Sequence, residues 1–171
     1  MNNLIDYLKK ESEKQVSFGK TQLVVIDWIF KKMKEFEHQI AKIGIEAFIL
    51  KDGKLLLGMR KNAVGAGEWG LPGGHLQTGE TNLECLKREL MEETGLEVKN
   101  AKLVAVDNNP QNAGGHYIHL GFQVETEGEP ELKEPNKCAG WEYFSLDNLP
   151  ANVFSAHKKE IELFRKGIIN D

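Results

Sequence analysis

The sequence predicts an α/β or α+β domain, with strands and helices in mixed order, preceded by a helical arm. Residues 42–171 contain short apolar runs separated by turn signals such as Asp52-Gly53, a pattern typical of strands joined in hairpins. Residues 1–40 contain one glycine and no proline, and their apolar residues recur at steps of three and four, as in an amphipathic helix. We therefore expect a helical arm over residues 1–40 and a folded domain over residues 41–171.

Five strands and two helices are expected in the domain. The strands are predicted at residues 42–50, 55–60, 101–108, 116–125 and 141–146. In the fourth of these, Ile118, Leu120, Phe122 and Val124 alternate with polar neighbours. The last helix is expected to start with Ser155 as its cap, to run through Lys166 and to stop at Gly167.

The other helix has stronger signals at both ends. Thr81 followed by Glu84 forms a capping box, and Gly95 fits the position that ends a helix. Its apolar stripe consists of Leu83, Leu86 and Leu90, which are expected to face the core.

The composition is that of a globular protein and excludes several classes. A net charge of −4 does not favour a nucleic acid partner, because the phosphates of DNA and RNA require a basic surface. Cys85 and Cys138 lie far apart and belong to no CxxC pair, which suits a reducing compartment. The first residues lack the apolar core of a signal peptide, and no apolar run has the length of a membrane span. We therefore expect a cytoplasmic protein without a DNA or membrane partner.

The capped helix places three carboxylates on one face. Glu89, Glu92 and Glu93 stand at i, i+3 and i+4, where their Cβ atoms are about 5–6 Å apart and the side chains can bind one ion together. A solvated acidic face is the ordinary alternative for such a cluster. The turn Pro72-Gly73-Gly74 just before it favours a ligand site, since glycine lets the backbone approach a ligand closely.

Residues 74–96, GHLQTGETNLECLKRELMEETGL, match the Nudix box at every defined position, from Gly74 and Glu80 to Gly95. Over residues 43–155 the chain resembles the MutT-type nucleoside triphosphate diphosphatases. This resemblance implies a mixed β-sheet sandwiched between helices. It also implies a loop–helix–loop that holds Mg²⁺ or Mn²⁺, and hydrolysis of a nucleoside diphosphate linked to another group. Hard cations with oxygen ligands suit such a reaction because they screen the negative diphosphate.

The resemblance also implies roles for individual residues. The metal ligands are expected to be Glu89, Glu92, Glu93 and the carbonyl group of Gly73, with Glu134 as a further ligand for metal or water. Glu89 is the first candidate for the base that activates water, although the sequence alone does not separate base from ligand.

Other residues are expected to bind substrate or to hold the box in place. Candidates for substrate contact are Arg60, Gly74, His75 and His116. Arg88 and Glu80 are expected to orient the box through a salt bridge rather than to touch substrate. Trp69, Tyr117 and Trp141 are expected in the core or the pocket wall, and Cys85 is expected to be unreactive.

The leading hypothesis is a Mg²⁺-dependent hydrolase that converts nucleoside triphosphates, including oxidised or non-standard ones, to monophosphate and pyrophosphate. Nucleotide sugars, dinucleoside polyphosphates, capped RNA and prenyl diphosphates remain alternative substrates, and a non-catalytic nucleotide-binding module is an alternative of another class. The proline cluster that marks ADP-ribose hydrolases is not seen after the box. The arm's apolar stripe favours a homodimer over packing in cis or membrane contact.

Overall fold

The computed structural model describes residues 29, 31, 32, 40–112 and 115–170. The chain divides into two units, residues 1–40 and residues 41–171. In the first unit Ile29, Lys31 and Lys32 are helical and exposed. The rest of the predicted arm lies outside the described residues, so its packing stays a prediction. Within the described residues no helix is both long and apolar enough to cross a bilayer.

The second unit is a seven-stranded mixed sheet with helices, which confirms the predicted fold class. Its elements are β1 (Lys42–Lys51), β2 (Lys54–Arg60), β3 (Trp69–Gly70), β4 (Gly73–His75), α3 (Asn82–Thr94), β5 (Glu97–Asn112), β6 (Gly115–Glu127), β7 (Cys138–Ser145), η1 (Ser155–His157) and α4 (Lys158–Lys166). The five predicted strands and both predicted helices are present. Strands β3 and β4 were missed because two or three residues carry no readable periodicity.

The hairpin of β1 and β2 separates soon after its turn. The two strands pair only at Leu50 with Leu55 and at Lys51 with Lys54. Beyond that point β1 pairs in parallel with β6 and antiparallel with β4, whereas β2 pairs with β3 and β7. The two halves of the hairpin therefore belong to different parts of the sheet.

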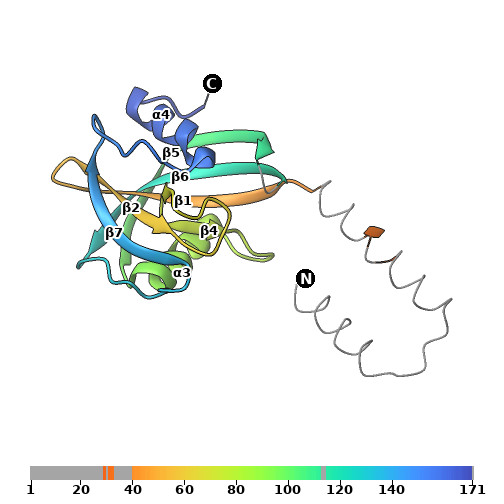
Figure 1. The fold of residues 1–171 in the computed structure, drawn as a ribbon, viewed down its shortest axis with the longest axis horizontal. Helices are drawn as coiled ribbons and strands as arrows, with labels where there is room; N and C mark the ends of the chain where they lie inside the picture. Colours follow the sequence, from red (N-terminus) through yellow and green to blue (C-terminus); the bar gives the residue numbers. More distant parts are fainter. Residues whose placement is uncertain (1–28, 30, 33–39, 113–114, 171) are drawn as a thin grey trace. The chain divides into compact units, whose positions relative to one another are not determined.

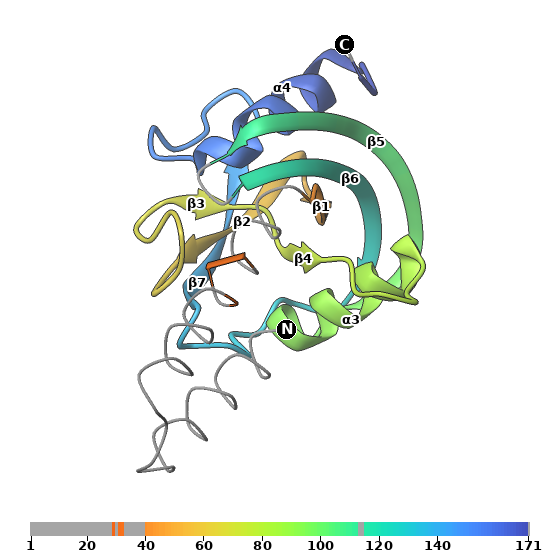
Figure 2. The ribbon, with the colours of Figure 1, turned by 90° about the vertical axis from the view of Figure 1, so that its right-hand side faces the viewer.

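Helices α3 and α4 cover opposite sides of the sheet (Figure 1), so the strands are buried on both faces. On the α3 side, Leu86 and Leu90 pack with Ile45 and Ala47 of β1. On the α4 side, Ile161 packs in the other cluster, with Phe48. Figure 2 shows β5 and β6 as a strongly curved pair that reaches from the α3 side to the α4 side. Neighbouring residues of β1 point to opposite faces of the sheet, so this strand contributes side chains to both hydrophobic cores.

Helix α3 has the predicted ends, but its buried stripe differs from the prediction. Thr81 accepts from the backbone N–H of Glu84, whose side chain accepts from the N–H of Thr81, and Gly95 adopts the left-handed conformation. Leu83 is 45% exposed, so its assignment to the core is wrong, and Cys85 is buried instead. The first turn extends past the packed region, which leaves Leu83 in solvent.

The start of α4 and the faces of β6 also differ from the predictions. Ser155 begins a 3₁₀ turn, and α4 starts at Lys158 without a side-chain cap, so the predicted cap is wrong. A tertiary contact holds this corner instead: the N–H of Leu71 donates to Nδ1 of His157 at 2.9 Å. In β6, Tyr117 is buried and lines a cavity, as expected of a residue in the core or the pocket wall, whereas His119 is buried although its polarity suggested an exposed face. Both faces of this strand are covered.

Candidate active site

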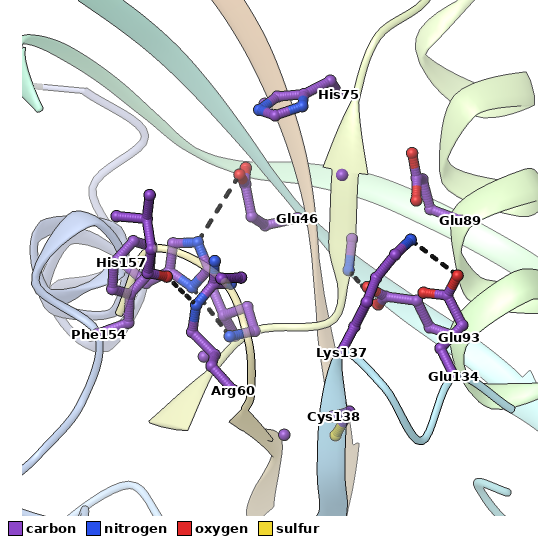
Figure 3. A pocket seen from close by; sticks show the side chains of 18 of the residues that line it. Glu46, Arg60, His75, Glu89, Glu93, Glu134, Lys137, Cys138, Phe154 and His157 are labelled. Atoms are coloured by element: carbon purple, nitrogen blue, oxygen red, sulfur yellow. Dashed lines mark hydrogen bonds and ion pairs between the residues drawn. The ribbon is translucent and has the colours of Figure 1, made fainter. Parts of the chain in front are cut away.

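A cavity of about 510 Å³ opens where β1 and β2 diverge. Its walls come from β1, β2, β4, α3, β6, β7, the β6–β7 loop and the segment before α4. Seven of the candidate ligand and substrate-contact residues line it: Arg60, Gly73, Gly74, His75, Glu89, Glu93 and Glu134. Tyr117 and Trp141, expected in the core or the pocket wall, line it as well. Figure 3 shows Glu89, Glu93 and Glu134 on one side of the cavity and Arg60, Glu46 and His157 on the other. Residues distant in sequence therefore converge on one concave surface.

The two glycines of β4 let the strand pass close to α3 and β1. A Cβ on Gly74 would stand 2.3 Å from the carboxyl group of Glu89. Gly73 has φ of +141°, and a Cβ there would stand 2.1 Å from the carbonyl oxygen of Ile45. Its N–H donates to Oε2 of Glu93 at 2.9 Å. At Gly73 only glycine fits, because a Cβ would collide with the backbone of β1, whereas at Gly74 a Cβ would displace the Glu89 carboxylate.

The carboxyl group of Glu93 is buried and lies near other carboxylates. Burial, together with the nearby charges of Glu89 and Glu134, raises its pKa to about 7, although the N–H of Gly73 partly offsets this. Lys137 pairs with Glu134 at 2.8 Å. The β6–β7 loop is tied to α3, since the N–H of Lys133 donates to the carbonyl of Glu93 at 3.2 Å. Carboxylates crowded in this way suit an added positive charge.

Arg88 holds the glutamate helix to the preceding loop. Its guanidinium forms the expected salt bridge to Glu80, at 2.6 Å from Nε, and also pairs with Glu89 at 2.6 Å. The hydrogen bonds from Arg88 lower the pKa of Glu80 to about 2. Glu92 reaches the same guanidinium only at 3.5 Å, and its side chain is 51% exposed. Glu92 does not line the cavity, unlike the three other glutamates of the predicted ligand set, Glu89, Glu93 and Glu134.

The candidate substrate-contact residues separate into two groups. Arg60 lies over the ring of Phe154, with its guanidinium carbon 4.2 Å from the ring centroid, and burial lowers its pKa. His75 also lines the cavity, and burial lowers its pKa. His116, by contrast, interacts with Oδ1 of Asn108 at 2.6 Å and does not line the cavity.

The predicted ligand set consists of oxygen donors, which suit a hard divalent cation. Glu89, Glu93 and Glu134 supply carboxylate oxygens to the same cavity, and Gly73 supplies a backbone position beside them. Mg²⁺ and Mn²⁺ prefer such oxygen ligands, and Mg²⁺ often keeps several waters, so the side chains need not form a closed cage. The raised pKa of Glu93 shows that its surroundings disfavour the ionised carboxylate. A bound cation would offset this effect, because it favours the ionised form.

A second cluster was missed in the sequence. Within the described residues, Glu46, His119, His157 and Glu160 are buried, and one potential ligand atom from each lies within 4.8 Å of the others. Glu46, His119 and His157 line the cavity, with Glu46 and His157 opposite the glutamate helix (Figure 3), whereas Glu160 does not line it. The available signal was Glu46, a charged residue in the middle of the otherwise apolar strand KIGIEAFIL.

A mixed sheet between helices, with a capped glutamate helix facing its cavity, is the arrangement expected of the Nudix box. The NUDIX domain model matches residues 42–165, and the chain belongs to this family. The chain is 38% identical over 133 residues to the ADP-ribose pyrophosphatase of Methanocaldococcus jannaschii, covering 77% of this chain and 76% of the relative. It is 34% identical over 114 residues to the oxidized purine nucleoside triphosphate hydrolase of Danio rerio, covering 64% and 70%.

A solved structure agrees with these relatives. The crystal structure of a MutT NUDIX hydrolase from Burkholderia pseudomallei is similar, with a TM-score of 0.68 and 33% identity, covering 72% of this chain and 98% of that one. The chain is therefore a Nudix hydrolase.

Proposed function

We propose that this protein is a Mg²⁺-dependent hydrolase of nucleoside triphosphates, including oxidised or non-standard ones, that releases the monophosphate and pyrophosphate. The observation that carries the proposal is the convergence of Glu89, Glu93 and Glu134 with the Gly73–Gly74 strand on one cavity that also contains Arg60. The relative from Danio rerio, whose name describes hydrolysis of oxidised purine nucleoside triphosphates, supports the substrate class.

Residues on the two sides of the cavity have different proposed roles. Gly73, Glu89, Glu93 and Glu134 hold the cation, with Glu92 nearby on the exposed side of the helix. When bound, Mg²⁺ screens the phosphate charge and polarises phosphorus towards a water nucleophile. Arg60 presents a planar guanidinium at the other side of the cavity, where it can bind phosphate oxygens.

Glu89 is the proposed base that takes the proton from the attacking water. Arg88 fixes the Glu89 carboxylate at 2.6 Å, and Gly74 leaves the space that this carboxylate occupies. Water adds to phosphorus, the bond between the α- and β-phosphates breaks, and the products are nucleoside monophosphate and pyrophosphate. Arg88 and Glu80 act as positioning residues, because their pair sets the helix against the loop.

The proposal is tested by a screen of nucleoside triphosphates, oxidised ones included, with Mg²⁺ and with EDTA. We expect hydrolysis only with metal, and pyrophosphate among the products. Hydrolysis of equal rate in EDTA, or orthophosphate as the only inorganic product, would contradict the proposal.

ADP-ribose is the second candidate substrate. The relative from Methanocaldococcus jannaschii is named an ADP-ribose pyrophosphatase and is 38% identical over most of the chain. Hydrolysis of ADP-ribose would give AMP and ribose 5-phosphate, with no pyrophosphate, so the products distinguish the two candidates. A higher kcat/KM for ADP-ribose than for every nucleoside triphosphate would replace the first proposal by the second.

Location and assembly complete the proposal. Cys85 and Cys138 are free and buried, which supports a reducing, cytoplasmic environment. Burial raises the pKa of the Cys85 thiol to about 12, so little of the reactive thiolate forms near neutral pH. This supports the expectation that Cys85 is unreactive. The homodimer remains a proposal that rests on the apolar stripe of the arm, outside the described residues.

A further inference from the structure

The cavity contains a lysine that the proposed reaction does not use. Among the described residues that line the cavity, the arginine and lysine side chains are those of Arg60 and Lys137. Arg60 lies across the cavity from the glutamate helix, whereas Lys137 lies beside Glu93 and Glu134 (Figure 3). The ammonium group of Lys137 is therefore at the end of the cavity where the cation is expected to bind.

The backbone of Lys137 is held by hydrogen bonds that do not involve its side chain. Its N–H donates to the carbonyl of Glu134 at 2.9 Å, and its carbonyl accepts from the N–H of Lys61 at 2.7 Å. The side-chain amide of Asn62 donates to the carbonyl of Asn136 at 3.0 Å. The β6–β7 loop is therefore joined to the residues after β2 whether or not Lys137 carries a charge.

The ammonium group can change its partner. Nζ pairs with Oε1 of Glu134 at 2.8 Å, and the side chain of Lys137 is 68% exposed. The hydrogen bond to Glu134, with the charges of Glu93 and Glu89, raises the pKa of Lys137, so the ammonium lies close to all three carboxylates. An exposed ion pair contributes little to stability, and the lysine side chain is flexible. The ammonium can therefore move to another anion while its backbone stays in place.

A bound substrate changes the charges around this ammonium. A divalent cation and the ammonium group of Lys137 repel each other, and both suit the carboxylate of Glu134. A phosphate chain held by that cation brings negative oxygens to the same end of the cavity. Lysine binds phosphate as a compact positive charge, and a hydrogen bond between two charged groups is stronger than one between neutral groups. The phosphate chain is thus a suitable second partner for Nζ.

A structural role alone explains the position of Lys137 less well. The loop is held by backbone hydrogen bonds and by Asn62. Lys133 of the same loop pairs with Glu131 at 2.6 Å but does not line the cavity. A lysine–glutamate pair of this loop therefore does not need to face the ligand space, whereas the pair formed by Lys137 does.

We propose that Lys137 is a substrate-binding residue whose ammonium group pairs with Glu134 in the metal-free protein and binds an oxygen of the substrate's phosphate chain when the cation is bound. The inference rests on the proposed function only in taking a phosphate chain as the ligand, and it holds for a nucleoside triphosphate and for ADP-ribose alike. Removing the charge should therefore have opposite effects, with weaker binding of phosphate and tighter binding of metal.

The first test measures metal binding to the full-length protein without substrate. Lys137→Met keeps most of the length of the side chain and removes its charge. Mn²⁺ is added to the wild type and to the variant, and the free ion is measured by electron paramagnetic resonance. Lys137→Met should bind Mn²⁺ more tightly by about threefold or more, because a positive charge that competes for Glu134 is removed.

The second test measures binding of inorganic pyrophosphate by calorimetry at saturating Mg²⁺. Pyrophosphate contains the linkage that both candidate substrates share and has no base or sugar. Lys137→Met should bind it about tenfold more weakly, as for loss of a hydrogen bond between charged groups. Lys137→Arg keeps a positive charge and its N–H donors, so it should stay within about threefold of the wild type.

Lys133→Met is the matched control, because it removes the same charge from the same loop outside the cavity. It should leave both affinities within about twofold of the wild type, and melting curves verify that each variant is folded.

Four results would overturn the proposal. They are a wild type that does not bind pyrophosphate, a pyrophosphate affinity within about twofold of wild type in folded Lys137→Met, unchanged or weaker Mn²⁺ binding in that variant, and an equal loss of pyrophosphate affinity in Lys133→Met. Failure of the proposed function looks different, since the wild type would then hydrolyse no nucleoside triphosphate. The two titrations need no turnover and test Lys137 in that case as well.

Discussion

Replacing Glu93 by glutamine should stabilise the metal-free protein at pH 8 while it removes a metal ligand. The pKa of Glu93 is raised from 4.5 to about 7, mainly because the carboxyl group is buried. A shift of about 2.5 units corresponds to about 3 kcal/mol, at 1.36 kcal/mol per unit. Glutamine has a similar shape and never ionises, so the variant avoids this unfavourable charge.

The pH at which the gain appears follows from the sign of the shift. The folded state binds the Glu93 proton more tightly than the unfolded state, so protonation favours folding at low pH. This contribution is lost as the pH rises from about 4.5 through the folded value of about 7. The advantage of Glu93→Gln should therefore be below about 1 kcal/mol at pH 5 and about 3 kcal/mol at pH 8.

Thermal unfolding in EDTA at pH 5 and pH 8 measures this difference. At this chain length about 3 kcal/mol corresponds to a rise of about 6–12 °C in Tm. Glu92→Gln is the matched control, since its side chain is 51% exposed, and it should change Tm little at either pH. Adding Mg²⁺ should stabilise the wild type and leave Glu93→Gln nearly unchanged. A Glu93→Gln variant that is less stable than the wild type at pH 8, or equally shifted at both pH values, would refute the reasoning.

Three further predictions concern other parts of the molecule. Glu89→Gln should lower kcat/KM by about 100-fold or more at saturating Mg²⁺, as for loss of a base or metal ligand; steady-state kinetics within about threefold of wild type would reject its role. Gly74→Ala should reduce activity by a similar factor with a folded protein, because its Cβ would stand 2.3 Å from the Glu89 carboxyl carbon. Gly140→Ala is the control for a strand glycine, because its Cβ would have open space and its φ is not positive. A chain that starts at Lys42 should be monomeric by light scattering and the full chain dimeric; two monomers of equal activity and solubility would contradict the arm's role as an interface.

Helix α3 and the longer strands were predicted from local sequence patterns. The capping box at Thr81 and the glycine at Gly95 fix α3 through contacts between neighbours in the sequence, and such contacts are readable without tertiary information. The alternation of apolar and polar residues over residues 116–125 likewise identified strand β6. Sequence patterns failed where tertiary packing decides: Leu83 has the right spacing for the core but lies beyond the packed turn of α3.

On the side of the cavity opposite the glutamate helix, the sequence singled out Arg60 but missed Glu46, His119 and His157. Glu89 and Glu93 are in one short segment with the spacing of a helix face, so the sequence brought them together. Glu46, His119 and His157 come from β1, β6 and the segment before α4, and no local spacing relates them. Their proximity results from the parallel pairing of β1 with β6 and from the corner that the Leu71–His157 hydrogen bond holds. A charge inside an apolar strand was the single local sign.

The most direct test of the proposed reaction is hydrolysis of a nucleoside triphosphate by the wild-type protein with Mg²⁺ in ¹⁸O-labelled water. Mass spectrometry of the products shows which phosphorus receives the oxygen. The arrangement of Glu89, Glu93 and Glu134 around the Gly73–Gly74 strand, in a chain that resembles the MutT-type diphosphatases, predicts label in the nucleoside monophosphate or in pyrophosphate. Label found only in released orthophosphate would contradict cleavage between the α- and β-phosphates.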